Sequence, residues 1–120
     1  MNWKELQAKM VGYRRDFHSF PEAGWTEFRT SSKISDILHE LGFQVLLGPE
    51  IIDLSSVMGR QETVIPYHQK RALEQGASEK WMDRMKGLTG VVGILDTGRQ
   101  GPTVSLRFDI DAVEMTEAAE

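Results

Sequence analysis

The chain contains no cysteine among its 120 residues. This absence excludes disulfide bonds, thiolate metal ligands and a cysteine nucleophile within the sequence. Long apolar runs are absent too, since no stretch approaches the roughly 20 apolar residues that a membrane-spanning helix needs. The first ten residues are amphipathic and lack the apolar centre of a secretory signal peptide. We therefore expect a cytoplasmic protein without a membrane partner.

Positive charge is also scarce. The chain carries 14 Lys and Arg against 18 Asp and Glu, which gives a net charge of −4. Binding to nucleic acid requires a basic patch, so we expect no nucleic-acid partner. A composition of 40% hydrophobic and 27% charged residues is typical of a globular protein, and 120 residues suffice for one domain with one core.

Two amphipathic helices are predicted in the first third of the chain. Residues 2–18 carry apolar residues at three- and four-residue steps: Trp3, Leu6, Met10, Tyr13 and Phe17. This helix should end before Pro21, which cannot continue the hydrogen-bond ladder. A second helix is expected from Thr26 to Leu41, with these residues inward: Phe28, Ile34, Ile37, Leu38 and Leu41. Gly42 suits its C-terminal end, and residues 43–47 then read as a short strand.

The middle of the chain, residues 50–88, is polar with broken apolar periodicity. We interpret it as an insertion with one or two helices between Pro66 and Lys86. Three large apolar residues, Trp81, Met82 and Met85, are expected on one helical face. That face should pack on the body of the domain or on a partner chain and support stability rather than chemistry.

The last third contains two apolar runs, Val91–Asp96 and Thr103–Phe108. Their short connection predicts antiparallel neighbours, because a parallel crossover needs about a dozen residues. Polar and apolar residues alternate in the second run, so one face should point to a core. The expected fold is α/β, with two N-terminal helices, a short strand, a helical insertion at about 50–88 and a β-hairpin. All of it would be the N-terminal part of a single catalytic domain over residues 1–120.

Asp109 and Asp111 follow the second run directly and are the candidate catalytic residues. Residues two apart in a strand point to the same face, and α/β enzymes often place functional groups at the carboxyl ends of buried strands. The pair could share a cation, or one carboxylate could orient a ligand held by another residue. The alternative, which the spacing by itself favours, is that two aspartates end a strand and begin a solvated turn.

Other catalytic motifs are not indicated. His18, His39 and His68 lie far apart and form no His-x-x-x-His pair. We expect His39 and His68 at the surface and His18 in a packed loop, with a role in the functional site as the alternative for His18. No Gly-x-Ser-x-Gly elbow is present, and the glycines near residue 90 lack the strand-then-helix context of a phosphate-binding loop.

Two segments together resemble a known family. Residues 13–30, YRRDFHSFPEAGWTEFRT, are similar to the opening signature of the amidohydrolase branch of the aminoacylase/carboxypeptidase metallopeptidases. Residues 101–112, GPTVSLRFDIDA, resemble the Arg-x-Asp-x-Asp-Ala-Leu strand of the same branch. The middle of the chain resembles one group within this branch, the aminobenzoyl-glutamate utilisation protein A group. The resemblance lies in residues 51–60, in the helical stretch through Trp81 and in residues 88–99. The resemblance covers essentially the whole chain but only about the first quarter of such an enzyme.

The resemblance implies a partial catalytic domain of a zinc-peptidase-like fold, from a hydrolase that cleaves an amide bond to glutamate or a similar amino acid. Zinc or manganese in a paired centre would activate water in the full-length enzyme, whose substrate would be an amide or peptide-like small molecule. Asp111 matches the supporting carboxylate of the wider superfamily's His-x-Asp motif, and Asp109 stands in place of its histidine. This branch takes its ligands from later motifs, so we expect the 120-residue chain alone to hold no metal and to be inactive.

The sequence departs from the family pattern at one point, and a hypothesis other than a hydrolase stays open. Val113-Glu114 stands where the branch normally has leucine-proline. The full enzyme is expected to form a homo-oligomer or to pair with a different protein as its partner. The alternative hypothesis is a non-enzymatic remnant that acts only as an association module.

Overall fold

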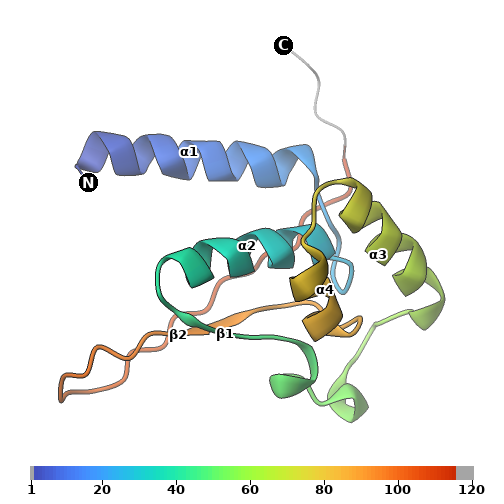
Figure 1. Cartoon of the computed structure of the whole chain (residues 1–120). Helices are drawn as coiled ribbons and strands as arrows, with labels where there is room; N and C mark the ends of the chain where they lie inside the picture. The colour runs from blue at the N-terminus through green and yellow to red at the C-terminus, as the bar shows by residue number, and fades with distance from the viewer. Residues whose placement is uncertain (1, 116–120) are drawn as a thin grey trace.

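The computed structural model describes residues 2–115, which form helices around one small sheet (Figure 1). The helices and strands are α1 (Trp3–Ser19), α2 (Phe28–Glu40), β1 (Gln44–Leu46), α3 (Ile65–Glu74), α4 (Glu79–Met85) and β2 (Val92–Ile94). Short 3₁₀ turns lie at η1 (Gly48–Glu50), η2 (Leu54–Ser56) and η3 (Glu62–Val64). The predicted helices, the first short strand and the α/β class are therefore confirmed.

Helix α1 begins at a capping box and ends before Pro21, as the sequence predicts. The Asn2 side chain accepts a hydrogen bond from the Glu5 amide at 2.9 Å, and the Glu5 carboxylate accepts one from the Asn2 amide at 3.3 Å. None of the α1 residues is buried, and Trp3 is 85% exposed. Only Tyr13 and Phe17 of its apolar stripe are half-buried, so most of the stripe has no core beneath it within residues 2–115. None of the helices over these residues is long and apolar enough to cross a membrane.

Helix α2 buries hydroxyl groups where aliphatic residues were predicted. Phe28 is fully buried as expected, but Leu41 is 66% exposed. The predicted inward residues Ile34, Ile37 and Leu38 are only half-buried, and the buried positions are instead Arg29, Thr30, Ser31, Ser32 and Ser35. The small serine side chains allow other segments to approach closely: Ser32 accepts a hydrogen bond from the Ser78 amide, and Ser31 accepts one from the Gly90 amide.

The hydrophobic core comes mostly from the segment 50–88. Five of its eight buried residues lie there, the full set being Phe28, Val45, Leu47, Ile65, Ala72, Trp81, Met82 and Met85. The prediction that Trp81, Met82 and Met85 pack on the body of the chain is confirmed. The Trp81 indole Nε1 also donates to the Asp36 carboxylate at 2.6 Å, so this residue joins α4 to α2 by packing and by a hydrogen bond.

The predicted β-hairpin is wrong. Strand β2 pairs with β1 in antiparallel register, with Gln44 opposite Ile94 and Leu46 opposite Val92. No backbone hydrogen bond joins Thr103–Phe108 to Val91–Asp96 in the part of the chain that the structure describes. The apolar residues of the second run are therefore not directed to a core: Val104 is 78%, Leu106 75% and Phe108 77% exposed.

The physical reason lies in the connection between the two runs. The Asp96 carboxylate accepts a hydrogen bond from the Gly98 amide, and the Thr97 hydroxyl accepts one from the Arg99 amide. These local turns satisfy the backbone of the connection without fixing a strand register. Gly93 also lets β2 pack closely against α2, because it has no side chain there: an added Cβ would lie only 3.0 Å from Leu38 Cδ1. Strand β2 is thereby held to β1, which lies about 50 residues earlier in the chain.

Gly48 offers a test of the packing between η1 and α4. Its φ is +58°, and an added Cβ would meet the Arg84 carbonyl oxygen at 2.6 Å and the Met85 carbonyl oxygen closer still. We predict that Gly48→Ala lowers the free energy of unfolding clearly more than Gly59→Ala does in urea titrations. Gly59 also has a positive φ but open space around it. Gly59→Ala should therefore lower the free energy of unfolding only by the cost of a left-handed backbone at alanine, about 1–2 kcal/mol. Equal losses would show that the α4 backbone can yield.

Trp81 tests whether the core depends on α4. We predict that Trp81→Ala lowers the free energy of unfolding by about 3–5 kcal/mol, since it leaves a cavity under α2. Trp3→Ala deletes the same side chain from an exposed position and should change it by less than about 0.5 kcal/mol. Thermal and urea unfolding measure both. Similar effects of the two variants would contradict the assignment of Trp81 to the core.

Candidate functional site

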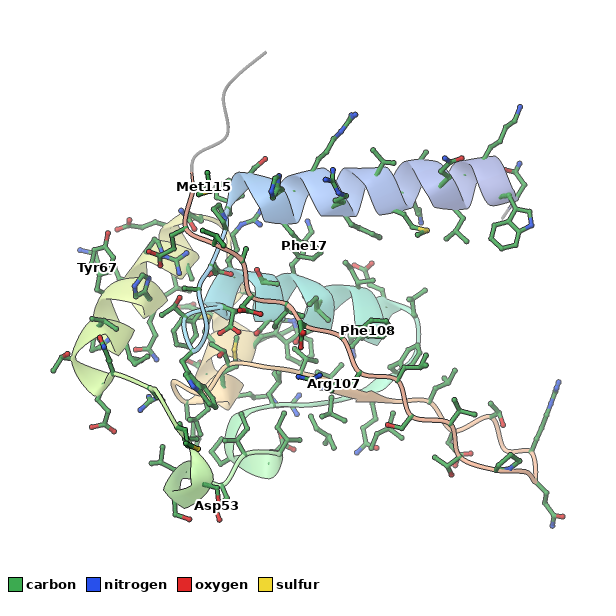
Figure 2. The ribbon with its side chains drawn as sticks, turned by 180° about the vertical axis from the view of Figure 1, so that it is seen from behind. Phe17, Asp53, Tyr67, Arg107, Phe108 and Met115 are labelled. Atoms are coloured by element: carbon green, nitrogen blue, oxygen red, sulfur yellow. The ribbon has the colours of Figure 1, made fainter. Side chains whose placement is uncertain are left out.

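The acidic pair, Asp109 and Asp111, lies on an extended segment rather than at a sheet rim. In Figure 2 this segment, with Arg107 and Phe108 labelled, crosses the face of α2 and runs toward the start of that helix. Both carboxylates are exposed, and Asp109 Oδ1 lies 2.9 Å from the Arg107 guanidinium. The pair therefore does not follow a sheet strand, contrary to the expectation from the sequence.

One hydrogen bond anchors the acidic segment to the body of the chain. The Ala112 amide donates to the Glu22 carbonyl oxygen at 2.8 Å. Within the described residues it is the only backbone hydrogen bond made by residues 103–115. Because the Ala112 amide belongs to the same peptide unit as the Asp111 carbonyl, this bond fixes Asp111 beside the loop of residues 20–27, called here the α1–α2 loop.

The Glu22 side chain organises that loop. Its carboxylate is fully buried and accepts hydrogen bonds from the amides of Arg29 at 2.9 Å and Thr30 at 2.6 Å. These amides are in the first turn of α2, where backbone donors lack intrahelical partners and the helix dipole favours negative charge. Glu22 therefore caps α2 from outside the helix.

Arg71 of α3 supplies the countercharge. Its Nη2 donates to Glu22 Oε2 at 2.9 Å and to the Thr26 carbonyl at 3.1 Å. Its Nη1 and Nε donate to Gln75 at 2.7 Å and to His68 Nδ1 at 3.1 Å. Burial, aided by the Arg71 charge, lowers the pKa of His68, which keeps the imidazole neutral and able to accept that bond. The guanidinium is thus held from three sides.

Glu27 brings a second carboxyl group to the acidic segment. It precedes α2, and its Oε1 accepts a hydrogen bond from the Thr89 hydroxyl at 2.8 Å. Burial raises the pKa of Glu27; hydrogen bonds from Thr89 and from backbone amides oppose this, and the nearby Asp111 charge adds to it. Glu27 therefore places a half-buried carboxyl group near the exposed carboxylate of Asp111, close enough for the two charges to interact.

The α1–α2 loop carries backbone strain next to this pair. Trp25 has a φ of +68°, in a backbone region that residues other than glycine rarely adopt. Its indole Nε1 donates to the Met58 carbonyl at 2.7 Å. Strained residues of this kind persist only where surrounding contacts hold them. The loop is therefore fixed by the segment 50–88 at two points, Met58 and Arg71.

A metal ion does not fit the described residues by themselves. Within residues 2–115 no group of three or more His, Cys, Asp or Glu side chains is placed to hold one. Asp109 and Asp111 supply two carboxylates on an exposed segment, whereas a zinc centre typically takes at least three protein ligands.

Sequence reasoning missed the buried members of the site. Glu22, Glu27, Arg71 and Thr89 were not predicted as site residues. The available signal was the pair of acidic residues just before a helix start, where the helix dipole attracts carboxylates. The Arg71 and Thr89 contacts span 49 and 62 residues and have no local signal.

The histidines take no part in the acidic pair. His39 is exposed as predicted, and its ring centroid lies 5.8 Å from that of Trp81. His68 is half-buried rather than at the surface, because Arg71 and Tyr67 contact it. His18 lies in the last turn of α1 with an exposed side chain, not in a packed loop.

Comparison with known proteins confirms the resemblance to the aminobenzoyl-glutamate utilisation group. The chain is 46% identical over 110 residues to a homolog of a p-aminobenzoyl-glutamate hydrolase subunit from Haemophilus influenzae, and 42% identical over 114 residues to the corresponding hydrolase subunit from Escherichia coli. It is 44% identical over 116 residues to an indole-3-acetyl-aspartic acid hydrolase from Enterobacter agglomerans. The alignments cover 91–95% of this chain. No family model matches the chain.

A solved structure agrees with these sequence relatives. The chain superposes on an aminobenzoyl-glutamate utilization protein from Klebsiella pneumoniae with a TM-score of 0.88 and 47% identity over 94% of its length. It spans 26–27% of the three curated relatives and 29% of that crystallised chain. The local fold is therefore that of the corresponding part of the crystallised protein.

The raised pKa of Glu27 predicts a specific pH dependence. A carboxyl group with a raised folded-state pKa contributes stability below its unfolded pKa of about 4.3 and loses it as pH rises through the folded value. Glutamine stays neutral throughout. We therefore predict that Glu27→Gln gains stability relative to the parent chain as pH rises from about 4 to 7, measured by urea unfolding at each pH.

Asp16 provides the control of opposite sign. Hydrogen bonds from Arg29 lower the pKa of Asp16, so its contribution is present above its unfolded pKa and is lost as pH falls through the folded value. Asp16→Asn should lose stability relative to the parent at pH 7, and the loss should shrink in acid. Profiles that change in the same direction with pH would contradict at least one of the two assignments.

Proposed function

We propose that this chain is part of the catalytic domain of a metal-dependent amidohydrolase with a zinc-peptidase-like fold. The observation that carries the proposal is the similarity of nearly the whole chain to proteins named as p-aminobenzoyl-glutamate hydrolase subunits, at 42% and 46% identity. The TM-score of 0.88 to an aminobenzoyl-glutamate utilization protein supports a shared local structure. Identity of this level over a folded core favours a common reaction class.

The substrate class follows from what the relatives' names have in common. Aminobenzoyl-glutamate and indole-3-acetyl-aspartic acid each join an aromatic acyl group to an acidic amino acid through an amide bond. We propose that a protein carrying this chain hydrolyses such an amide, with glutamate or aspartate as the released amino acid. The products would be the aromatic carboxylic acid and the free amino acid.

Asp111 and Asp109 are the proposed catalytic residues of this chain. Asp111 is favoured because the Ala112–Glu22 hydrogen bond holds its peptide in place and because the buried end of α2 presents Glu27 to it. Asp109 has only the exposed ion pair with Arg107, so its orientation is less constrained.

Metal dependence is proposed for the longer protein. A bound zinc or manganese pair would activate water and polarise the scissile carbonyl. Because residues 2–115 contain no cluster of three ligands, we propose that the metal ligands are drawn mainly from the part of the relatives' length that this chain does not span. Asp109 and Asp111 would contribute at most a supporting carboxylate.

Assembly is a second proposal, favoured by a specific observation. Val104, Leu106 and Phe108 expose most of their surface on a segment without strand pairing among residues 2–115. Exposed apolar residues that lie close together in the chain commonly mark contact surfaces. We propose that the protein forms a homo-oligomer or pairs with a different protein as its partner. An association module without hydrolase activity would retain the same surface.

The test uses protein expressed from the complete reading frame that encodes this chain. We expect release of p-aminobenzoate from p-aminobenzoyl-glutamate, inhibition by a chelator and recovery with zinc or manganese. Asp111→Asn should lower kcat at least about 100-fold with the circular dichroism spectrum unchanged, because a catalytic carboxylate loses its charge.

Asp83→Asn is the matched control, since Asp83 is an exposed carboxylate on α4 remote from the acidic pair in sequence. It should retain full activity. Absence of hydrolysis with both the glutamate and the aspartate amide, from folded and metal-supplied protein, would support the association module instead.

A further inference from the structure

The backbone next to Asp111 is held by a single hydrogen bond within the described residues. The segment from residue 103 to 115 makes one backbone hydrogen bond within the described residues, from Ala112 to the Glu22 carbonyl. The segment carries no strand ladder there to fix its register. The position of such an extended segment depends on the group that accepts its hydrogen bond. For Asp111, that group is the Glu22 carbonyl.

The Glu22 side chain fixes its own backbone, and Arg71 fixes the side chain. The carboxylate has two donors in the first turn of α2 and one in α3, all at 2.6–2.9 Å. Removing Arg71 would leave a buried carboxylate with two amide donors and no countercharge. Such a group is strongly destabilised unless it is rehydrated or protonated. Either change would displace residues 20–27.

We propose that Arg71 is a positioning residue for Asp111. It holds the Glu22 carboxylate, Glu22 presents its carbonyl to Ala112, and Ala112 fixes the peptide that follows Asp111. The segment 50–88 then contributes to catalysis as well as to the core, beyond the stabilising role that the sequence suggested. The catalytic part of this inference rests on the proposed function of Asp111, but the positional part does not.

The geometry requires an arginine. Three guanidinium nitrogens reach four acceptors that diverge around one plane: Glu22, Thr26, Gln75 and His68. A lysine ammonium is a single point donor and cannot span them. The Thr26 contact adds a second hold on the α1–α2 loop, four residues beyond Glu22. Arg71→Lys therefore keeps the charge and loses the geometry.

The first measurement uses the 120-residue chain and needs no activity. Amide hydrogen exchange by NMR should show the Ala112 amide exchanging at least about tenfold faster in Arg71→Met than in the parent. Exchange at the core amides of Leu47 and Met85 should change much less. Arg71→Lys should give an intermediate rate, and it serves as the test if Arg71→Met does not fold.

Arg84→Met is the matched control. Arg84 is another arginine of the segment 50–88, and it donates to the Val45 carbonyl and to Glu50 without contacting the α1–α2 loop. It should leave Ala112 exchange unchanged even if it lowers global stability. Equal acceleration of all amides in Arg71→Met, or no acceleration at Ala112, would overturn the inference.

The second measurement uses the hydrolase expressed from the complete reading frame. Misplacement of Asp111 should lower kcat by about 10- to 100-fold in Arg71→Met with KM largely kept, and Arg71→Lys should recover part of the loss. An unchanged kcat in an active enzyme would overturn the catalytic part. If the parent hydrolyses neither amide, the proposed function fails, and the exchange comparison alone still decides whether Arg71 holds the anchor.

Discussion

The rest of this structure depends on the hydrogen bonds and the ion pair made by the buried carboxylate of Glu22. It joins three parts of the chain: the first turn of α2, helix α3 through Arg71, and, through its own backbone carbonyl, the acidic segment at Ala112. Taking a carboxylate and a guanidinium out of water costs several kcal/mol per ion. That cost is offset only while every donor stays in place, so a small displacement at any of the three parts weakens the other two.

The same constraint connects packing to the proposed chemistry. The hydroxyl face of α2 lets the start of α4 and Gly90 approach closely, and the Trp81 indole secures α4 from the other side. With these helices fixed, Glu27 receives the Thr89 hydroxyl and lies near the Asp111 charge. The core of the segment 50–88 therefore supports the site through α3 and through the residues that follow α4.

Local sequence patterns predicted the helices and the first strand well. Strand pairing and the contacts around the candidate site depend on residues far apart in the chain and were not predicted. Apolar spacing and Pro21 located α1, and the docking of Trp81, Met82 and Met85 was correctly expected. The hairpin prediction failed because a short connection was taken to specify pairing, whereas β2 pairs with β1 about 50 residues away. Alternation along Thr103–Phe108 predicted a buried face, yet no surface within residues 2–115 covers it. Asp109 and Asp111 were predicted as site residues from their residue type and remain a prediction, whereas Glu22 and Glu27 emerged only from their contacts in the structure.

A double-mutant cycle on the free energy of unfolding tests the central claim most directly. Glu22→Gln, Arg71→Met and the double variant would be compared with the parent chain in urea at neutral pH. If the buried pair organises the loop, the double variant should be no less stable than Arg71→Met alone, and the coupling energy should exceed about 1 kcal/mol. Additive losses, with a coupling energy near zero, would contradict the account, because Glu22 and Arg71 would then act independently.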